Sequence, residues 1–348
     1  MEQLSMIGLD LAKESFQVHG VDVNGRACVR KRLKRREVLK WFGALEPCIV
    51  AIEACGSAHY WGREIGRLGH AVRLVPAQYV TPFVKRGKTD AGDAEAICEA
   101  AGRPSMRFVP VKTVDNQAAG LLHSARSLLV KTRTMLINAV RGSLAEFGIV
   151  AAKGTDKLDD LRTKMDDACA QHMPDQVRRA LAPLFEQIDQ TTEKIHRLTL
   201  ELKIYLKSSP LARRLMTIPG IGLLGATALS VMVPDVKHFR NGRHLAAWLG
   251  LTPKQNATGG KPRQGRISRA GDAYLRRLLV LGGTALVRSM KRGTSGMALW
   301  AQGLMQRRPA KVVAVALANK IARIVYALMA TGEAFDPKRA VPIGDVAA

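Results

Sequence analysis

The sequence of 348 residues is poor in aromatic and in acidic side chains. Aromatic residues make up 5% of the chain, so aliphatic and alanine side chains must form most of its core. Asp and Glu number 29 against 54 Lys and Arg, a formal net charge of +25. An excess of this size favours a polyanionic partner. The 47% share of hydrophobic residues excludes a disordered chain.

Cysteine pairs, export signals and long apolar runs are also lacking. The five cysteines show no CxxC spacing, which argues against a disulfide framework or a zinc site. The N-terminal residues 1–4 lack the basic start and apolar stretch of a signal peptide. The longest apolar runs, such as residues 278–287, are about half the length of a membrane span. We therefore expect a cytoplasmic protein with no membrane partner.

The first hundred residues have an α/β pattern. A short apolar strand over 5–9 ends at Asp10, and a buried-type strand over 48–52 ends at Glu53. Further strands are expected over 15–23, 26–33 and 71–75, with helices over 36–45 and 58–68. A three-strand meander followed by alternating helix and strand predicts an RNase H-like fold.

The middle of the chain has helical spacing. A long helix is expected over 114–147, and a second after Pro183. In the second helix Ile188, Ile195 and Leu202 recur every seven residues, which predicts a coiled coil able to join domains or subunits. The polar, weakly patterned segment 151–175 between them is expected to be a hinge.

A compact Gly-rich helical region is expected from Pro210 to about Gly332. We expect an Ala/Leu helix ending at Val233, a loop over 253–271, then two apolar helices, and disorder after Pro337. The predicted organisation is a catalytic domain over 1–110, a helical linker over 111–209, a C-terminal domain over 210–335 and a tail over 336–348.

Four carboxylates form the candidate catalytic centre. Asp10 and Glu53 follow the first and fourth strands, whose ends are neighbours in an RNase H-like sheet. Asp90 and Asp93 open a helix at i, i+3 and face the same way. Clustered negative charges need a divalent cation, and hard oxygen ligands favour Mg²⁺ or Mn²⁺. Such ions stabilise the attacking and leaving oxygens in phosphoryl transfer.

Each acid also has a purely structural interpretation. Asp10 fits a turn residue at a strand end, Glu53 a solvated edge carboxylate, and Asp90 a helix N-cap. Because Asp10 and Glu53 both follow apolar strands at the same predicted end of the sheet, we favour the metal site.

With these residues in place, the chain resembles the DEDD transposases of the bacterial insertion sequence 110 and 1111 group, which are themselves similar to Piv-type DNA invertases. The resemblance covers nearly the whole chain, with the Asp-Glu-Asp-Asp set matched by Asp10, Glu53, Asp90 and Asp93 in a RuvC-like domain. The run from Lys88 to Ala94 is the most specific match. The C-terminal transposase domain is matched by the segments 218–222, 249–253, 259–261 and 266–271.

The resemblance implies a DNA transposase or site-specific recombinase with two further properties. A hydroxyl in the C-terminal domain, usually a serine just before the glycine loop, attacks the scissile phosphate and holds the DNA covalently. A structured non-coding RNA of the element, the bridge RNA, pairs with donor and target DNA.

This sequence departs from the pattern at the attacking hydroxyl. Thr258 stands where the serine is expected, preceded by Ala257. A threonine can act as a nucleophile, although its methyl group crowds an in-line attack. Ser268 is the second candidate, with a helix N-cap as its structural interpretation. A third possibility is that Ala257 replaces the serine.

Two basic segments are candidate nucleic-acid surfaces. Residues 103–150 carry a net of +5, and residues 253–292 carry ten Lys or Arg against Asp272 alone, a net of +9. The second segment surrounds Thr258, and DNA binding there should weaken steeply with salt. Its expected contacts are Lys254, Lys261, Arg263, Arg266, Arg269, Arg276 and Arg277. The turn Pro219–Gly222 fits either a phosphate-holding hairpin or a tight helix–helix turn.

The sequence therefore predicts a recombinase in which both domains act on one phosphate, within a dimer or tetramer. Two alternatives remain open. One is a RuvC-like nuclease that uses metal ions and water without a covalent intermediate. The other is a non-enzymatic basic nucleic-acid-binding protein whose carboxylates are structural.

Overall fold

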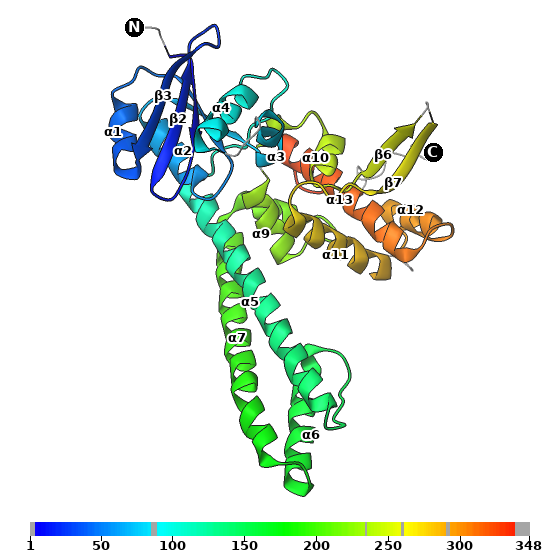
Figure 1. Ribbon diagram of the computed structural model, residues 1–348. Coiled ribbons are helices and arrows are strands. Elements are labelled where there is room, and N and C mark those ends of the chain that lie inside the picture. Colours follow the sequence, from blue (N-terminus) through cyan, green and yellow to red (C-terminus); the bar gives the residue numbers. More distant parts are fainter. Residues whose placement is uncertain (1–3, 85–88, 234, 259–260, 290–292, 338–348) are drawn as a thin grey trace. The chain divides into compact units, whose positions relative to one another are not determined.

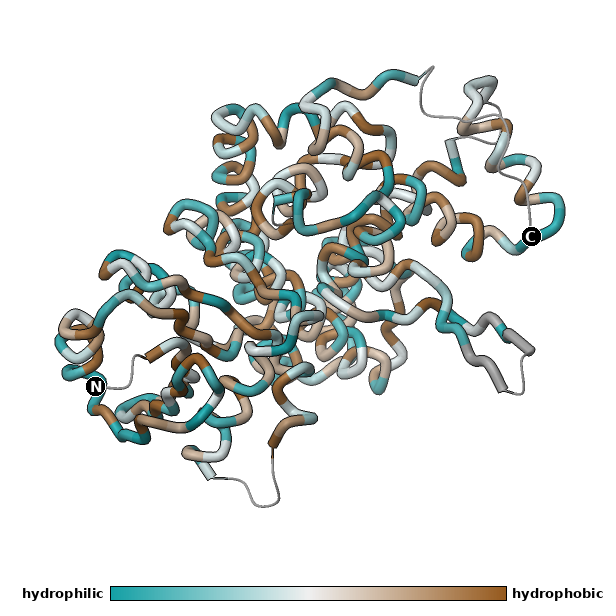
Figure 2. The backbone as a smooth tube through the Cα atoms, turned by 90° about the horizontal axis from the view of Figure 1, so that it is seen from above, coloured by the Kyte–Doolittle hydropathy of each residue, from teal (hydrophilic) through white to brown (hydrophobic). Residues whose placement is uncertain are grey.

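The computed structural model describes residues 4–84, 89–233, 235–258, 261–289 and 293–337. By its contacts the chain divides into two compact units, an N-terminal unit of residues 1–115 and a C-terminal unit of residues 116–348. Along the tube of either unit, apolar and polar residues alternate (Figure 2), as expected where each element buries one face.

The N-terminal unit is a five-stranded mixed sheet with the strand order β3-β2-β1-β4-β5. β1 pairs antiparallel with β2 and parallel with β4, so the ends of the first and fourth strands are neighbours, as predicted. Its strands are β1 (Met6–Asp10), β2 (Ser15–Val21), β3 (Ala27–Lys34), β4 (Ile49–Glu53) and β5 (Ala71–Val75). Its helices are η1 (Arg35–Glu37), α1 (Val38–Gly43), α2 (Ala58–Arg67), α3 (Ala77–Val80), η2 (Thr81–Phe83) and α4 (Asp90–Ala101).

Helices cover both faces of this sheet. Ile7, Leu9 and Phe16 on one face pack with Phe42 of α1 and Trp61 of α2. The other face contributes a smaller cluster in which Ala51 and Val75 pack with Ile97 of α4. α4 lies on this second face, and Ala94 near its start contacts Gly8 close to the end of β1.

The C-terminal unit begins with an arm of two long helices, α5 (Val114–Ala145) and α7 (Asp175–Ser208), which run side by side (Figure 1). Arg126 on α5 donates to the Thr199 hydroxyl on α7 at 2.9 Å, and Arg133 donates to Thr192 at 3.4 Å. The order of these contacts makes the pair antiparallel. The predicted seam on α7, at Ile188, Ile195 and Leu202, is buried. The two helices thus form a hairpin within one chain, while a supercoiled coiled coil stays a prediction.

Two expectations for the arm were wrong. The predicted hinge contains η3 (Thr155–Lys157) and α6 (Leu158–Gln171), because Leu161 and Met165, at helical spacing, pack against α5 and α7. In addition, α7 begins at Asp175, before Pro183. Pro183 removes a hydrogen bond inside the helix, yet Leu181 and Phe185 on either side of it are buried and keep the helix intact.

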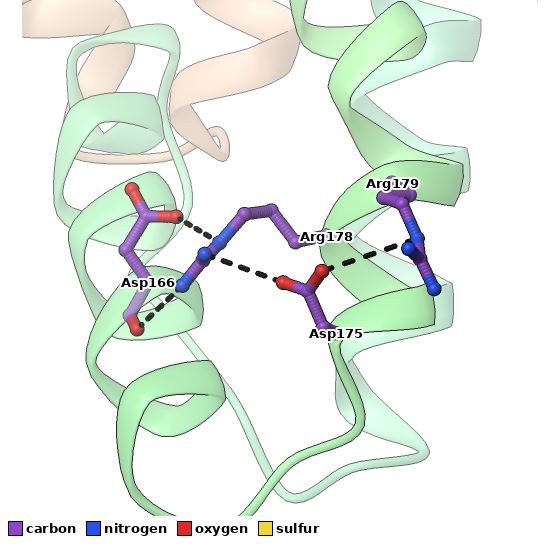
Figure 3. Close-up of polar contacts among 4 residues, drawn as sticks. All are labelled: Asp166, Asp175, Arg178 and Arg179. Atoms are coloured by element: carbon purple, nitrogen blue, oxygen red, sulfur yellow. Dashed lines mark hydrogen bonds and ion pairs between the residues drawn. The ribbon is translucent and has the colours of Figure 1, made fainter.

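Ion pairs join α6 to the start of α7 at the tip of the arm (Figure 3). Arg178 of α7 lies 3.2 Å from Asp166 of α6 and 3.3 Å from Asp175, which also pairs with Arg179 at 3.9 Å. These side chains are partly exposed, so each pair contributes at most about 1 kcal/mol, and the apolar cluster beneath them sets the fold.

The rest of the C-terminal unit is a compact helical body. It consists of α8 (Pro210–Met216), α9 (Leu223–Met232), η4 (Val236–His238), α10 (Gly242–Trp248), α11 (Ala273–Ser289), α12 (Gly296–Met305) and α13 (Ala310–Thr331). In the described part of the chain after residue 271, three helices are present where two were expected. α11 and α13 can approach closely because Gly283 has no side chain. A Cβ at this position would lie only 2.2 Å from the carbonyl oxygen of Ala314. The tail after Pro337 lies outside the described residues.

The predicted loop over 253–271 was wrong for most of its length. β6 (Pro253–Thr258) and β7 (Lys261–Ile267) pair as an antiparallel hairpin. The sequence of this hairpin does not alternate between apolar and polar residues, because its two strands are held by backbone pairing. The signal that was present is Gly259-Gly260, a pair favoured in two-residue hairpin turns.

Among the described residues one helix, α13, is long and apolar enough to cross a membrane. Lys311, Lys320 and Arg323 interrupt this helix, so it does not contradict the expectation drawn from uninterrupted apolar runs. Several of its side chains, among them Leu317, Ile321 and Val325, are fully buried in the helical core, which accounts for its apolar composition.

Candidate active site

Asp10 and Glu53 lie side by side at one end of the sheet. Leu9 of β1 is paired with Ile52 of β4, and each acid is the next and last residue of its strand. Both side chains are half-buried. The edge interpretation of Glu53 was wrong, because β4 lies between β1 and β5 in the interior of the sheet.

Asp90 and Asp93 occupy the first turn of α4. The N-cap is Thr89, whose hydroxyl accepts a hydrogen bond from the Gly92 backbone N–H at 3.2 Å, so the N-cap interpretation of Asp90 was wrong. Negative charges in a first helical turn are stabilised by the helix dipole. Lys88 of the same motif lies outside the described residues.

Gly8 lets α4 approach this end of the sheet. A Cβ at Gly8 would lie 2.1 Å from the carbonyl oxygen of Ala94 and 2.8 Å from the Cβ of Cys98. Only a residue without a side chain fits such a gap. Gly8 is two residues before Asp10 and on the same face, and Ala94 directly follows Asp93. This close contact therefore brings the helix carboxylates towards the strand carboxylates.

The electrostatics of Asp10 reflect this gathering of charge. Burial, followed by the negative charges of Asp93, Asp90 and Glu53, raises the pKa of Asp10 from 3.8 to about 6, against a lowering by the Leu11 backbone N–H. Burial, followed by the charges of Glu53 and Asp10, also raises the pKa of the Cys55 thiol. Glu53, Asp90 and Asp93 are thus close enough to Asp10 for their charges to act on it.

The same carboxylates do not converge tightly around one point. Within the described part of the chain, no three acidic, histidine or cysteine side chains are grouped tightly enough to hold a metal ion. The donor set itself, four carboxylates, suits a hard divalent cation.

The second candidate region lies at the base of the β6–β7 hairpin. Gly250 has a positive φ of 71°, and a Cβ there would meet the Ala270 carbonyl oxygen at 2.4 Å. Gly271 likewise has a positive φ of 66°, and a Cβ there would lie 2.0 Å from the Trp248 carbonyl oxygen. Two motifs that are separate in the sequence, 249–253 and 266–271, are therefore in direct backbone contact. We call this contact the interlock.

Ser268 lies within this interlock and Thr258 at the far end of the hairpin. The Ser268 N–H donates to the Thr252 carbonyl at 2.8 Å, and its hydroxyl accepts from the Ala270 N–H at 3.4 Å. The N-cap interpretation of Ser268 was wrong, because Asp272 accepts from the Leu275 N–H at 2.8 Å and caps α11. Thr258 ends β6, five residues from Pro253 and so about 17 Å away along the strand.

The predicted phosphate contacts fall into two groups. Lys254, Arg263, Arg266 and Arg269 are exposed, whereas the side chain of Lys261 is outside the described residues. Arg276 donates to the carbonyl oxygens of Leu249 at 3.1 Å and Ala270 at 2.5 Å, which fastens the interlock. Arg277 stacks over the Tyr274 ring at 5.1 Å and donates to Ser127 of α5 at 3.3 Å.

The turn Pro219–Gly222 joins α8 to α9 and is built for close packing. Gly220 has φ 85°, and a Cβ on Gly282 of α11 would meet the Gly220 carbonyl oxygen at 2.0 Å. The positive φ of Gly220 and its close contact with Gly282 are explained by the structural interpretation, in which the segment is a tight helix–helix turn. Its alternative role as a phosphate-holding hairpin stays a prediction.

The strand order and the acidic end of the sheet agree with an RNase H-like domain of the DEDD type. A family model described as transposase, of this DEDD type, matches residues 7–149. A second, described as the transposase of the IS116/IS110/IS902 family, matches residues 212–296.

Related proteins extend the match over nearly the whole chain. A "Probable family 20 transposase" of Pseudomonas aeruginosa is 48% identical over 336 residues, 96% of this chain and 99% of the relative. The transposase for insertion sequence element IS1111A of Coxiella burnetii is 37% identical over 96% of this chain and 92% of its own length. The pilin gene-inverting protein of Moraxella bovis is 25% identical over 95% of this chain and 98% of its own length.

This chain therefore belongs to the IS116/IS110/IS902 family of transposases, which are enzymes that cut and transfer DNA strands. The predicted resemblance is confirmed. The alternative of a non-enzymatic basic protein is wrong.

One contributor to the site and one charged segment of the same unit were missed in the sequence. Gly8 was not singled out, although a glycine two residues before a strand-end acid is a signal of close helix approach. The basic run from Arg30 to Arg36 was also passed over, although it holds six Lys or Arg in seven residues.

Proposed function

We propose that this transposase cuts and rejoins DNA with Asp10, Glu53, Asp90 and Asp93 holding Mg²⁺, or Mn²⁺, and a C-terminal hydroxyl as nucleophile. In this proposal residues 1–110 form the RuvC-like catalytic domain, residues 111–209 the helical linker and residues 210–335 the domain with the nucleophile. The observation that carries it is the placement of Asp10 and Glu53 at neighbouring strand ends, with Asp90 and Asp93 on the helix that packs against Gly8.

The donor set supports a divalent cation in two ways. Its oxygens are those that Mg²⁺ prefers. A bound cation would also offset the negative charges of Asp93, Asp90 and Glu53, which add to burial in raising the pKa of Asp10. When bound, Mg²⁺ supplies charge stabilisation for the phosphate oxygens of the reacting strand. The chain's own part is to hold the carboxylates at the ends of β1, β4 and α4.

The nucleophile is proposed to be Thr258, with Ser268 in second place. Its oxygen forms a bond to phosphorus and loses its proton, while the 3′-oxygen of the cut strand leaves and gains one. The DNA stays attached through its 5′-phosphate until a new 3′-hydroxyl reverses the step.

Backbone strain supports the choice of these two regions. Among the described residues the non-glycine positions with positive φ are Ser57, at 70°, and Arg269, at 57°. Ser57 lies just beyond Glu53, and Arg269 directly follows Ser268. Such strained residues cluster at functional sites because the surrounding structure must hold them there.

The partners we propose are donor and target DNA, a bridge RNA and further copies of the chain. The RNA rests on the family resemblance and on the charge of +25. A dimer or tetramer is supported by the outer face of α5, where Leu121, Leu128 and Met135 recur every seven residues and are 67%, 63% and 62% exposed. An exposed heptad stripe of this kind suits a second helix. The place of action is proposed to be the cytoplasm.

The experiment that tests the reaction uses a DNA suicide substrate, in which cutting releases a short fragment and traps the intermediate. With Mg²⁺, the protein should migrate with attached DNA on a denaturing gel, and mass spectrometry should find the DNA on Thr258. Thr258→Ala should abolish the adduct, whereas Ser268→Ala and the control Thr331→Ala should keep it.

Other outcomes separate the alternatives. Cutting without any adduct would establish the metal-and-water nuclease instead. Loss of the adduct only in Ser268→Ala would move the nucleophile to that serine. Sequencing of the RNA that co-purifies with the protein should recover one discrete non-coding species, and a random mixture would contradict a guide.

A further inference from the structure

The edge strand β3 carries a row of cations on one face. Arg30, Arg32 and Lys34 alternate along β3 and are all exposed. Leu33 between them is 1% exposed and is buried in the core on the opposite face. Because neighbouring side chains of a strand point to opposite faces, the burial of Leu33 fixes these three side chains on the other side.

This row faces the same side of the sheet as the carboxylates. In the strand register Asp10 is paired with Gln17, and Gln17 with Arg32. Two residues further along the strands, Gly8 is paired with His19, and His19 with Arg30. Side chains of residues paired across strands lie on one face, and the contact of Gly8 with α4 shows that this is the face that α4 covers. Two strand spacings separate Asp10 from Arg32, about 10 Å.

The row is available to an anion. In the described part of the chain none of its three side chains forms an ion pair with a carboxylate. Arg32 donates to the Ser15 hydroxyl at 3.0 Å, and Glu37, the nearest acid in sequence, accepts from the backbone N–H of Lys34 at 3.0 Å. Arg35 is different, since its guanidinium lies over the rings of Phe16 and Trp61.

We propose that Arg30, Arg32 and Lys34 form a phosphate row that binds the backbone of the DNA strand beside the scissile phosphate. The inference rests on the proposed function, because that function places the scissile phosphate at Asp10. Alternate residues of a strand are about 6.8 Å apart, and phosphates of one DNA strand are spaced about 3.4 Å along the duplex axis. Three long cationic side chains at this spacing can follow several consecutive phosphates. The roughly 10 Å to Asp10 corresponds to about three phosphates from the cut.

A competing explanation is that the cations only protect the edge of the sheet. Charged residues on edge strands prevent pairing with other chains. Protection of the edge requires charged residues on β3, but they can lie on either face and need not bind nucleic acid. A measurement of DNA binding therefore distinguishes this explanation from the phosphate row.

The experiment compares two triple variants of the full chain with equal loss of charge. The row variant is Arg30→Gln, Arg32→Gln, Lys34→Gln. The control variant is Lys31→Gln, Arg36→Gln, Lys40→Gln, which removes exposed cations from the same unit outside the row. Binding to a labelled DNA duplex of arbitrary sequence is followed by fluorescence anisotropy over a salt series in EDTA. All six side chains are exposed, so both variants should keep the thermal unfolding midpoint of the parent.

The expected result is a slope of log K against log salt that is shallower by about two to three units in the row variant, one for each lost phosphate contact. The control variant should change the slope by less than about one unit. Equal slopes in the two variants would overturn the proposal, as would a row variant that loses affinity for an RNA duplex of the same sequence and keeps it for DNA. Since EDTA prevents cutting, this result is independent of whether the proposed nucleophile or metal site is correct.

Discussion

Gly8 of β1 and Ala94 of α4 meet so closely that a single methyl group on Gly8 would lie 2.1 Å from the Ala94 carbonyl oxygen. This backbone contact is the point at which the helix with Asp90 and Asp93 is held against the strand that ends in Asp10. The carboxylate site therefore depends on a residue that carries no chemistry of its own.

Gly8→Ala should lower the free energy of unfolding by about 1–3 kcal/mol, because the added methyl forces α4 away from the sheet. It should also weaken Mg²⁺ binding, measured by calorimetry at a temperature where the variant is folded. The matched control is Gly66→Ala in α2, where a Cβ meets nothing within 4 Å and alanine should stabilise the helix by about 0.5–1 kcal/mol. Equal stability of Gly8→Ala and the parent would contradict the close contact.

Asp10→Asn should abolish strand cutting and yet stabilise the metal-free protein. The folded pKa of Asp10, about 6, lies above its ordinary value of 3.8. The ionised carboxylate is therefore destabilising above pH 6, and the penalty disappears as the pH falls below about 4. Since Asp10 is only half-buried, we expect a gain of about 1–2 kcal/mol at pH 8. Urea denaturation at pH 8 and pH 4 checks this, and a gain that is the same at both values would refute the assigned cause.

Arg276→Gln and Lys254→Gln should separate loop support from phosphate binding. Arg276 donates to two backbone carbonyls, so its replacement should cost about 1–3 kcal/mol of stability. Lys254 is exposed on β6, so its replacement should leave stability within about 0.5 kcal/mol and make the salt slope of DNA binding shallower by about one unit. The assignment fails if Arg276→Gln changes only the slope.

Replacing Leu121, Leu128 and Met135 together by glutamine should reduce the molecular mass measured by light scattering. These apolar side chains lie on the outer face of α5, and their removal takes away the apolar contact proposed for a second copy. The control replaces Leu281, Leu299 and Val312, which are similarly exposed on α11, α12 and α13. A monomeric parent, or an unchanged mass in the α5 variant, would rule out this surface.

Much of the N-terminal unit was predictable because its local patterns agree with its tertiary structure. Short apolar strands ending at Asp10 and Glu53, and a helix opening at Asp90, are each visible within a few residues of sequence. α6 and the β6–β7 hairpin were missed for the opposite reason. α6 is stabilised by packing with distant helices, and the hairpin by backbone pairing without an apolar face.

The sequence alone determined the charge, the family and the identity of the four acidic residues, because residue types and their spacing are local properties. Tertiary structure decided what those residues are to one another. It set Glu53 beside Asp10, brought α4 against Gly8, interlocked Gly250 with Ala270 and turned the cations of β3 to the face of Asp10. Each of these relationships comes from strand register or from close backbone approach, and both depend on pairings between segments that are distant along the chain.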